Sequence, residues 1–463
     1  MGAVCQDFYR SLEKPRRAVM GFARLAKLGF TLEIGDRQFP MHSSASRGRF
    51  MTEWHAIEGG ITAPKGYKAA GIAAGLKPSG APDLALIWSE AEAIAAGVFT
   101  TSQVRAACVD YCRQRLRQKP AAHAILCNAG QANAATGAQG WADALESAQL
   151  LAEAIGFPSE SVLVASTGVI GQRIKMDALR AGIPKLVAAA SETGSEDAAR
   201  AIITTDLVTK SIALETTIEG RPVRIGGISK GSGMIHPNMA TMLGFVTCDA
   251  TVSPPLWQEM VSRAADRSFN QITVDGDTST NDTLLALANG QSRTGAITEM
   301  GPEAEKLEAM LTAVCMHLAK AIARDGEGAT CLIEIRVGGA PDDASARQVA
   351  RTVAGSSLLK SAVFGRDPNW GRIAAAAGRA DIPFEQDNLR IQLGEFLLME
   401  HGQPLPFDRP AASAYLKQAA AGAYLEADTV VIALDLGAGN GSGIAWGCDL
   451  SYDYVKINAE YTT

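Results

Sequence analysis

The chain has 463 residues, of which 47% are hydrophobic and 20% charged, and its formal net charge is −6. This length is too great for a single hydrophobic core, so we expect two or more lobes. The composition is typical of a globular protein, and the acidic balance argues against a nucleic-acid partner. No uninterrupted apolar run reaches the roughly 18–20 residues that a membrane-spanning helix needs.

The eight cysteines are scattered along the chain, and no two of them have the CxxC spacing of a metal or redox site. Such a pattern indicates reduced thiols. We therefore expect a cytoplasmic protein without a metal ion.

Residues 1–50 differ from the rest of the chain. They carry nine Lys and Arg against four Asp and Glu, a local balance of +5 in an acidic protein. A transit peptide should be basic but poor in acidic residues, which this stretch is not. We interpret it as an extension outside the mature fold, and the sequence leaves the true start open between Met1 and Met51.

The body of the chain alternates predicted strands and helices. Ser89 and Glu92 form a capping box, which predicts a short helix that Gly97 closes. The other predicted elements, in chain order, are a strand at 124–127, a helix at 141–155 ending at Gly156, a strand at 161–166, helices at 253–266 and 302–323, and strands at 330–337, 429–436 and 446–457. This mixture indicates an α/β protein, and residues 340–344 are expected to form a loop between lobes.

The stretch 230–243, with the sequence KGSGMIHPNMATML, changes character near its end. Turn formers precede Ala240, whereas the residues after Thr241 are apolar and strand-like. In such a place the Thr241 hydroxyl can attack the carbonyl of Ala240, and hydrolysis of the resulting ester frees the amino group of Thr241. An α-amine has a pKa of about 7.7–8.0, so it can act as general base for its own hydroxyl. From these residues alone, an ordinary glycine-rich turn before a strand is the better-supported interpretation.

The same stretch resembles the processing site of the ornithine acetyltransferases (glutamate N-acetyltransferases), self-cleaving proteins of arginine biosynthesis. Other polar blocks resemble this family in the same order from about Ile61 to the end, at residues 63–71, 128–137, 272–283, 364–373 and 445–463. The resemblance implies a layered α/β sandwich with a second, smaller α/β lobe from about residue 340. It also implies cleavage into an α chain, 51–240, and a β chain, 241–463, with two of each in the assembly.

The activity that the resemblance implies is transfer of acetyl from N-acetylornithine to glutamate through acetyl-Thr241, without a cofactor. It leaves open whether acetyl-CoA is also a donor. Thr167 and Gly168, which follow the predicted strand at 161–166, would form the oxyanion hole. The substrate-binding residues that it implies are Thr204, Lys230, Thr241, Glu327, Asn458 and Thr463. Lys230 would supply a cation and Glu327 a carboxylate, and the choice between Thr204 and Thr205 stays open.

Three alternatives compete with this interpretation. Residues 430–443, VVIALDLGAGNGSG, are similar to the first motif of an adenosylmethionine-dependent methyltransferase, but only twenty residues remain for the rest of such a sheet. A self-cleaving aminopeptidase or amidase of related fold would use water as acceptor, so its activity would not depend on glutamate. A non-enzymatic amino-acid-binding protein would stay uncleaved and inactive.

Overall fold

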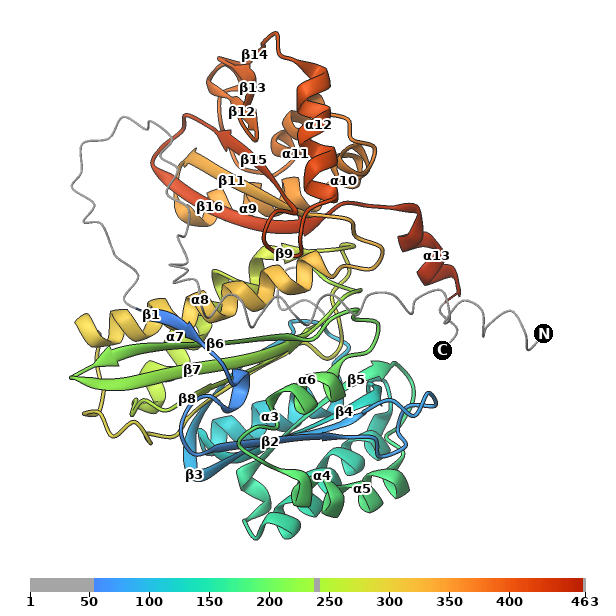
Figure 1. The fold of residues 1–463 in the computed structure, drawn as a ribbon, viewed down its shortest axis with the longest axis vertical. Helices are drawn as coiled ribbons and strands as arrows, with labels where there is room; N and C mark the ends of the chain where they lie inside the picture. Colours follow the sequence, from blue (N-terminus) through green and yellow to red (C-terminus); the bar gives the residue numbers. More distant parts are fainter. Residues whose placement is uncertain (1–53, 237–241, 461–463) are drawn as a thin grey trace.

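The computed structural model describes residues 54–236 and 242–460. The described chain forms a larger part and a smaller part stacked along the long axis of the molecule (Figure 1). Each part is built around its own sheet, of nine strands in the larger part and seven in the smaller. The two parts correspond to the two lobes that the length of the chain predicts.

The nine-stranded sheet has the order β1-β6-β7-β8-β10-β3-β4-β5, with β2 also paired to β3. Its strands are β1 Trp54–Ile57, β2 Tyr67–Ile72, β3 Leu84–Phe99, β4 Ala121–Gln131, β5 Val162–Val169, β6 Lys210–Ile218, β7 Arg221–Lys230, β8 Leu243–Cys248 and β10 Thr283–Ala288. The strand predicted directly after Thr241 is confirmed as β8, which lies in the middle of this sheet.

The long strand β3 joins two layers of the larger part. Its first half pairs with β2 and β4, its second half pairs with β10, and the register shifts between Trp88 and Ala93. Alternate side chains of β8 point to opposite faces, as in any strand. Phe245 belongs to the core shared with β3 and β4, whereas Val246 belongs to the core shared with helices α7 and α8.

Helices cover both outer faces of these two layers. Those that pack against β2, β4 and β5 are α3 Ala107–Gln118, α4 Gly137–Ile155, α5 Met176–Ala189 and α6 Ser195–Ile202. Those that pack against the layer of β7, β8 and β10 are α7 Pro254–Asp266 and α8 Pro302–Arg324. The result is a helix–sheet–sheet–helix arrangement, which confirms the predicted layered α/β sandwich.

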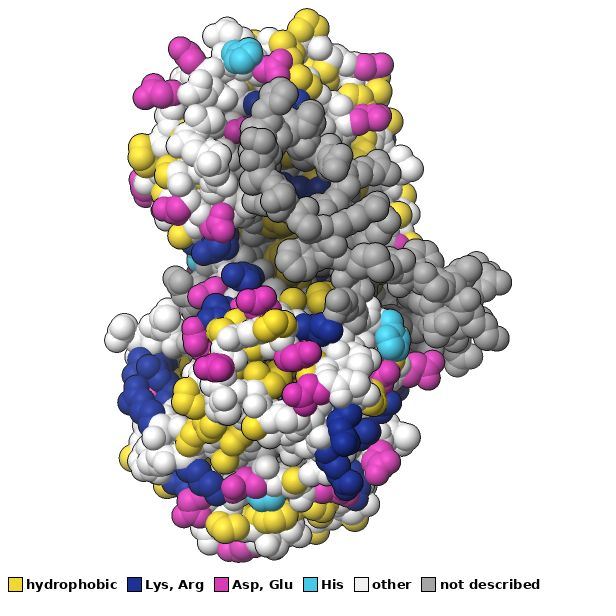
Figure 2. Space-filling view, turned by 90° about the vertical axis from the view of Figure 1, so that its left-hand side faces the viewer, with side chains coloured by type: hydrophobic (Ala, Val, Ile, Leu, Met, Phe, Trp, Pro, Cys, Tyr) yellow, Lys and Arg dark blue, Asp and Glu magenta, His cyan; other side chains and the backbone are white. Residues whose placement is uncertain are grey.

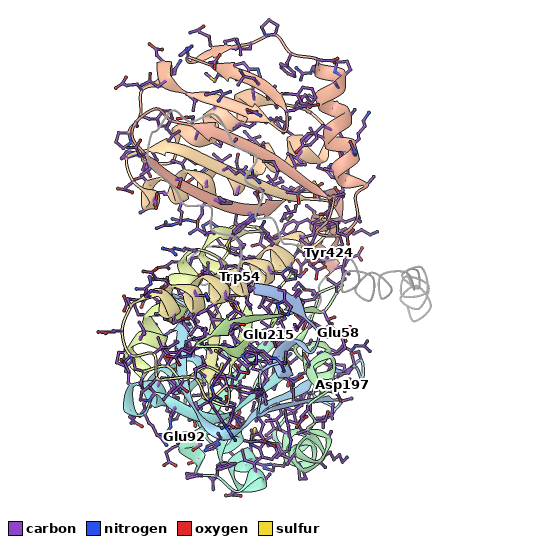
Figure 3. The ribbon with its side chains drawn as sticks, turned by 60° about the vertical axis from the view of Figure 1, so that its left-hand side comes forward. Trp54, Glu58, Glu92, Asp197, Glu215 and Tyr424 are labelled. Atoms are coloured by element: carbon purple, nitrogen blue, oxygen red, sulfur yellow. The ribbon has the colours of Figure 1, made fainter. Side chains whose placement is uncertain are left out.

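The smaller part contains the sheet β14-β13-β12-β15-β11-β16-β9. Its strands are β9 Ile272–Thr273, β11 Leu332–Ala340, β12 Arg390–Leu393, β13 Phe396–Glu400, β14 Gln403–Pro404, β15 Thr429–Asp435 and β16 Gly441–Cys448, and the helices packed on it are α9 Asp343–Ala354, α10 Ser357–Phe364, α11 Trp370–Gly378 and α12 Arg409–Ala420. Tyr424 lies where the two parts meet (Figure 3), and its hydroxyl donates to the carbonyl of Ala321 in α8 at 3.0 Å. The last described helix, α13 Tyr452–Glu460, projects from the junction of the two parts (Figure 1).

Several sequence-based predictions are confirmed by these elements. Helix α4 ends at Ile155 and is followed by Gly156 in the left-handed region, with φ of +77°. Helix α7 begins at Pro254, directly after Ser253. The glycine-rich turn after β15 leads into strand β16 rather than a helix, and both strands pair with β11. The nucleotide-binding turn of a methyltransferase leads from a strand into a helix, so this strand–turn–strand geometry does not match it.

The helix predicted from Ser89 and Glu92 is wrong, because both residues belong to strand β3. Ser89 is fully buried opposite Tyr67 of β2, and Glu92, labelled in Figure 3, forms an ion pair with Lys119. The alanine-rich segment has good helix propensity, but pairing with strands on both sides overrides that local preference.

The strand predicted over 446–457 is also wrong beyond Cys448, where β16 ends. The side-chain oxygen of Ser451 accepts a hydrogen bond from the backbone N–H of Asp453 at 3.2 Å, and helix α13 begins at Tyr452. Tyr452 is 85% exposed and Val455 is 65% exposed, so the alternating apolar residues bury no strand face here.

The seven cysteines within the described residues are free and buried. In the same part of the chain, no group of three or more His, Cys, Asp or Glu side chains is placed to hold a metal ion, and no helix is long and apolar enough to cross a membrane. On the face shown in Figure 2, acidic and basic side chains are interspersed over the larger part.

Candidate active site

The proposed oxyanion pair lies at the end of β5. Thr167 and Gly168 pair with Ala129 and Gly130 of the parallel strand β4. Gly168 has a φ of +129°, and a Cβ at this position would lie 2.3 Å from the carbonyl carbon of Gly130. Only glycine fits this close approach, so the backbone of β5 turns here without a side chain in the way.

Lys230 reaches Thr167 from the other layer of the sandwich. It is the last residue of β7 and is only 4% exposed, and its Nζ lies 3.3 Å from Oγ1 of Thr167. The two residues are therefore brought together by the packing of two layers, although 63 positions separate them in the sequence. An ammonium group and a hydroxyl donor thus meet beside the Gly168 turn.

Asp206 connects this pair to Thr204. The Oδ2 atom of Asp206 accepts a hydrogen bond from the N–H of Thr204 at 3.1 Å and lies 4.0 Å from Nζ of Lys230. Its Oδ1 atom accepts from the N–H of Gly231 at 2.6 Å. Burial alone would raise the pKa of the Asp206 carboxyl, but the ammonium groups of Lys210 and Lys230 outweigh this and hold the pKa below its usual value.

Glu327, between α8 and β11, and Asn458, in α13, meet beside the residues that follow Gly231. Nδ2 of Asn458 donates to Oε2 of Glu327 at 2.8 Å, and the N–H of Glu327 donates to the carbonyl of Ser232 at 3.1 Å. A Cβ on Gly233 would lie 2.5 Å from Oε2 of Glu327, so a larger residue here would displace the Glu327 carboxylate. The segment 230–233 is therefore lined by a cation at its start and by a carboxylate with an amide at its end.

The remaining predicted residues, Ala240, Thr241 and Thr463, lie outside the described residues. The structure brings the six described ones, which are Thr167, Gly168, Thr204, Lys230, Glu327 and Asn458, to the loop that leads toward Thr241. Thr204 and Thr205 are both half-buried, so the choice between them stays open.

A buried carboxylate that the sequence did not single out lies at the start of β8. Oδ1 of Asp282 accepts a hydrogen bond from the N–H of Met242 at 3.0 Å, and its Oδ2 has no hydrogen-bond partner among the described residues. Burial raises the pKa of this carboxyl well above its usual value. The sequence feature that could have pointed to Asp282 is its position within the polar block 272–283.

A second carboxylate, Asp275, supports the loop at Met234 and Ile235, a few residues before the proposed cleavage site. Its Oδ2 accepts from the N–H of Met234 at 2.6 Å, and its Oδ1 accepts from the N–H of Ile235 at 2.8 Å. Met234 has a φ of +59°, which is uncommon for a residue with a side chain. The Asp275 carboxylate thus holds an unfavourable backbone turn in place.

Together, the fold and these contacts define a two-lobed α/β protein with a charged site around a glycine-rich loop that leads to a central strand. A family model described as the ArgJ family matches residues 68–463. The chain belongs to the ArgJ family. This confirms the resemblance indicated by the sequence motifs.

Two curated relatives agree with this assignment. Arginine biosynthesis bifunctional protein ArgJ 1 from Nostoc sp. is 78% identical over 413 residues, which are 89% of this chain and 100% of the relative. The chloroplastic ArgJ of Populus trichocarpa is 58% identical over 414 residues, covering 89% of this chain and 85% of that protein. A solved ornithine acetyltransferase complexed with ornithine, from Mycobacterium tuberculosis, is 41% identical over 40% of this chain and 98% of that chain, with a TM-score of 0.37.

Proposed function

We propose that this chain is an acetyltransferase of arginine biosynthesis that moves the acetyl group of N-acetylornithine to glutamate through an ester on Thr241. The observation that carries the proposal is the family match, which runs through every residue assigned to the site from Thr167 to Thr463. The 78% identical relative is an arginine biosynthesis bifunctional protein.

The charges of the site suit amino-acid substrates. Both substrates carry an α-carboxylate, and ornithine carries a side-chain ammonium group. Lys230 offers a buried cation for the first, and Glu327 with Asn458 offers a carboxylate and an amide for the second. Thr463 would add a hydroxyl beside the α-carboxylate of the chain.

The chemistry follows from these roles. The α-amine of Thr241 takes the hydroxyl proton while Oγ1 attacks the acetyl carbonyl. The Thr167 hydroxyl and the Gly168 N–H donate to the oxyanion of the tetrahedral intermediate. Collapse breaks the C–N bond, and the departing ornithine amine receives the proton from the Thr241 ammonium group. The amine of glutamate then attacks the acetyl ester by the same steps in reverse, which regenerates the hydroxyl.

Self-cleavage before Thr241 would create this nucleophile and divide the chain into 1–240, or 51–240, and 241–463. The pieces would stay together, because β7 and β8 form six successive pairs across the cleavage site, from Ile225 with Cys248 to Lys230 with Leu243. We assign two copies of each piece to the assembly. Residues 1–50 are assigned to an extension outside the mature fold.

The word bifunctional in the names of the relatives supports a second reaction, in which acetyl-CoA acetylates glutamate. No cofactor is needed for either reaction, because Thr241 itself carries the acetyl group. We place both activities in the cytoplasm, since free, buried thiols suit a reducing compartment.

Intact mass and a transfer assay test this function. The purified protein should give two masses that correspond to cleavage before Thr241, whereas Thr241→Ala should give one full-length mass and no activity. Ornithine release from N-acetylornithine should require glutamate. Release that proceeds equally without glutamate would indicate the aminopeptidase or amidase alternative, and two masses from Thr241→Ala would exclude Thr241 as the residue that cleaves the chain.

A further inference from the structure

A group of buried charges lies directly behind the candidate active site. The Nζ atom of Lys210, at the start of β6, is 2.7 Å from Oδ1 of Asp206 and 2.6 Å from Oδ2 of Asp325. The side chains of Lys210 and Asp206 have no exposed surface. Buried ion pairs contribute little net stability compared with packed apolar residues, so their presence calls for another explanation.

The two carboxylates hold separate segments of the site. Asp206 accepts from the N–H of Gly231, as described above, and Asp325 accepts from the N–H of Leu207 at 3.0 Å through Oδ2. The carbonyl of Asp325 also accepts from the Ser232 hydroxyl at 2.7 Å. The Lys210 ammonium lies between both carboxylates and therefore ties the loop around Leu207, the glycine loop and the end of α8 together.

Lys210 also determines how strongly Asp206 attracts Lys230. Asp206 has two ammonium groups near it, and that of Lys210 at 2.7 Å is closer than that of Lys230 at 4.0 Å. Attraction between opposite charges is strong away from water. Without Lys210, the Asp206 carboxylate would draw Lys230 toward itself and away from Thr167, which Lys230 now contacts at 3.3 Å.

We propose that Lys210 is a positioning residue for the reaction, because its buried ammonium pairs with Asp206 and Asp325 and so leaves Lys230 directed at Thr167 and the substrate. This inference rests on the proposed function, in which Lys230 binds the substrate carboxylate. Lys210 itself touches neither the substrate nor the reacting atoms.

Steady-state kinetics of a single and a double variant test the charge argument. Lys210→Met should raise KM for N-acetylornithine at least ten-fold and lower kcat less. Adding Asp206→Asn to it removes the attraction on Lys230 while keeping an acceptor for Gly231, so KM should return at least part of the way. An unchanged KM in Lys210→Met, or a double variant no better than the single one, would overturn the proposal.

The matched control is Arg263→Met, which also removes one cation paired with a buried carboxylate, Glu308, but on helices α7 and α8. It should lower stability without changing KM.

If Lys210→Met alone does not fold, Asp206→Asn is compared with the double variant. Once Asp206 is neutral, loss of Lys210 should change KM less than three-fold, and a further ten-fold rise would overturn the proposal.

A crystal structure of Lys210→Met gives a result that does not depend on the enzymatic function. The Nζ atom of Lys230 should leave Thr167 and come within about 3.2 Å of Oδ2 of Asp206. An unmoved Lys230 would contradict the inference whatever the substrate is. Lack of acetyl transfer by the wild-type protein would instead contradict the proposed function.

Discussion

Asn458 donates a hydrogen bond to the Glu327 carboxylate at 2.8 Å, across 131 positions of the sequence. This contact brings the carboxyl-terminal helix α13 against the loop between α8 and β11. No residue of α13 is buried, although the ring of Tyr452 packs edge-on against that of Phe364. In the proposed function the contact has a role, because Asn458 and Glu327 would bind the substrate together.

Asn458→Ala should therefore change substrate binding more than stability. Loss of the amide leaves Glu327 without this donor, and we expect KM for N-acetylornithine to rise about ten-fold. The free energy of unfolding should change by less than about 0.5 kcal/mol, as for other exposed positions. Val455→Ala, on an exposed position of the same helix, is the control and should leave KM unchanged. Equal KM values for both variants would show that Asn458 has no part in substrate binding.

Thr167→Ala should lower kcat far more than it raises KM. Loss of one oxyanion donor costs roughly 100- to 1000-fold in rate, or about 2.7–4 kcal/mol. Thr167→Ser keeps a hydroxyl that can accept from Lys230, and it should retain most of the activity. The measurement is steady-state kinetics on fully cleaved protein, and a Thr167→Ala variant with wild-type kcat would show that this hydroxyl has no part in the reaction.

Local signals in the sequence predicted much of the fold. Gly156 ends α4 and Pro254 begins α7 because these residues favour their own backbone geometry, whatever surrounds them. The segment around Ser89 was assigned wrongly because its conformation depends on pairing with distant strands. Helix α13 was missed because an alternating apolar pattern indicates a strand only where one face can be buried.

The residues of the site also divide into those that the sequence predicted and those that it did not. The family motifs predicted Lys230, which ends β7, and Glu327, whose N–H donates to the carbonyl of Ser232 just after that strand. Lys210 pairs with Asp206 four positions away and with Asp325 115 positions away, and the second contact could not be found from the sequence because no local pattern links the two residues. Contacts that depend on the packing of several segments become visible only in three dimensions.

The junction of the two parts should be sensitive to acid through Glu334. Lys320 of α8 lies 3.0 Å from this carboxylate of β11, and the Trp446 side chain donates to it at 2.8 Å. Burial alone would raise the pKa of Glu334, but the positive charges of Lys320 and Arg336 outweigh it and lower the pKa to about 2. Ionised Glu334 therefore stabilises the folded state. The pKa of glutamate in the unfolded chain is about 4.3, so this contribution is lost as the pH falls from about 4.3 toward 2.

The pKa of Glu334 is about two units lower in the folded state than in the unfolded chain. This difference corresponds to a stabilisation of roughly 3 kcal/mol at neutral pH. Glu334→Gln should shift the urea unfolding midpoint strongly at pH 7 and about half as much at pH 3. Glu426→Gln, at an exposed position, is the control and should have a small effect at both values. A shift for Glu334→Gln that is the same at pH 3 and pH 7 would show that the ionised carboxylate is not what stabilises the junction.

Asp275→Ala should slow self-cleavage. The Asp275 carboxylate accepts from the N–H groups of Met234 and Ile235, and Met234 has a left-handed backbone at φ of +59°. Without these acceptors the turn has no compensation for its strain, and the chain leading to Ala240 and Thr241 loses its support. We expect the cleavage rate to fall at least ten-fold, measured by gel or intact mass at successive times after a pulse of cell-free synthesis.

Asp277→Ala removes an exposed carboxylate two residues away and should cleave at the wild-type rate. Asp275→Asn keeps one acceptor oxygen and should fall between the two. Cleavage of Asp275→Ala as fast as that of Asp277→Ala would show that the turn at Met234 does not prepare the cleavage site.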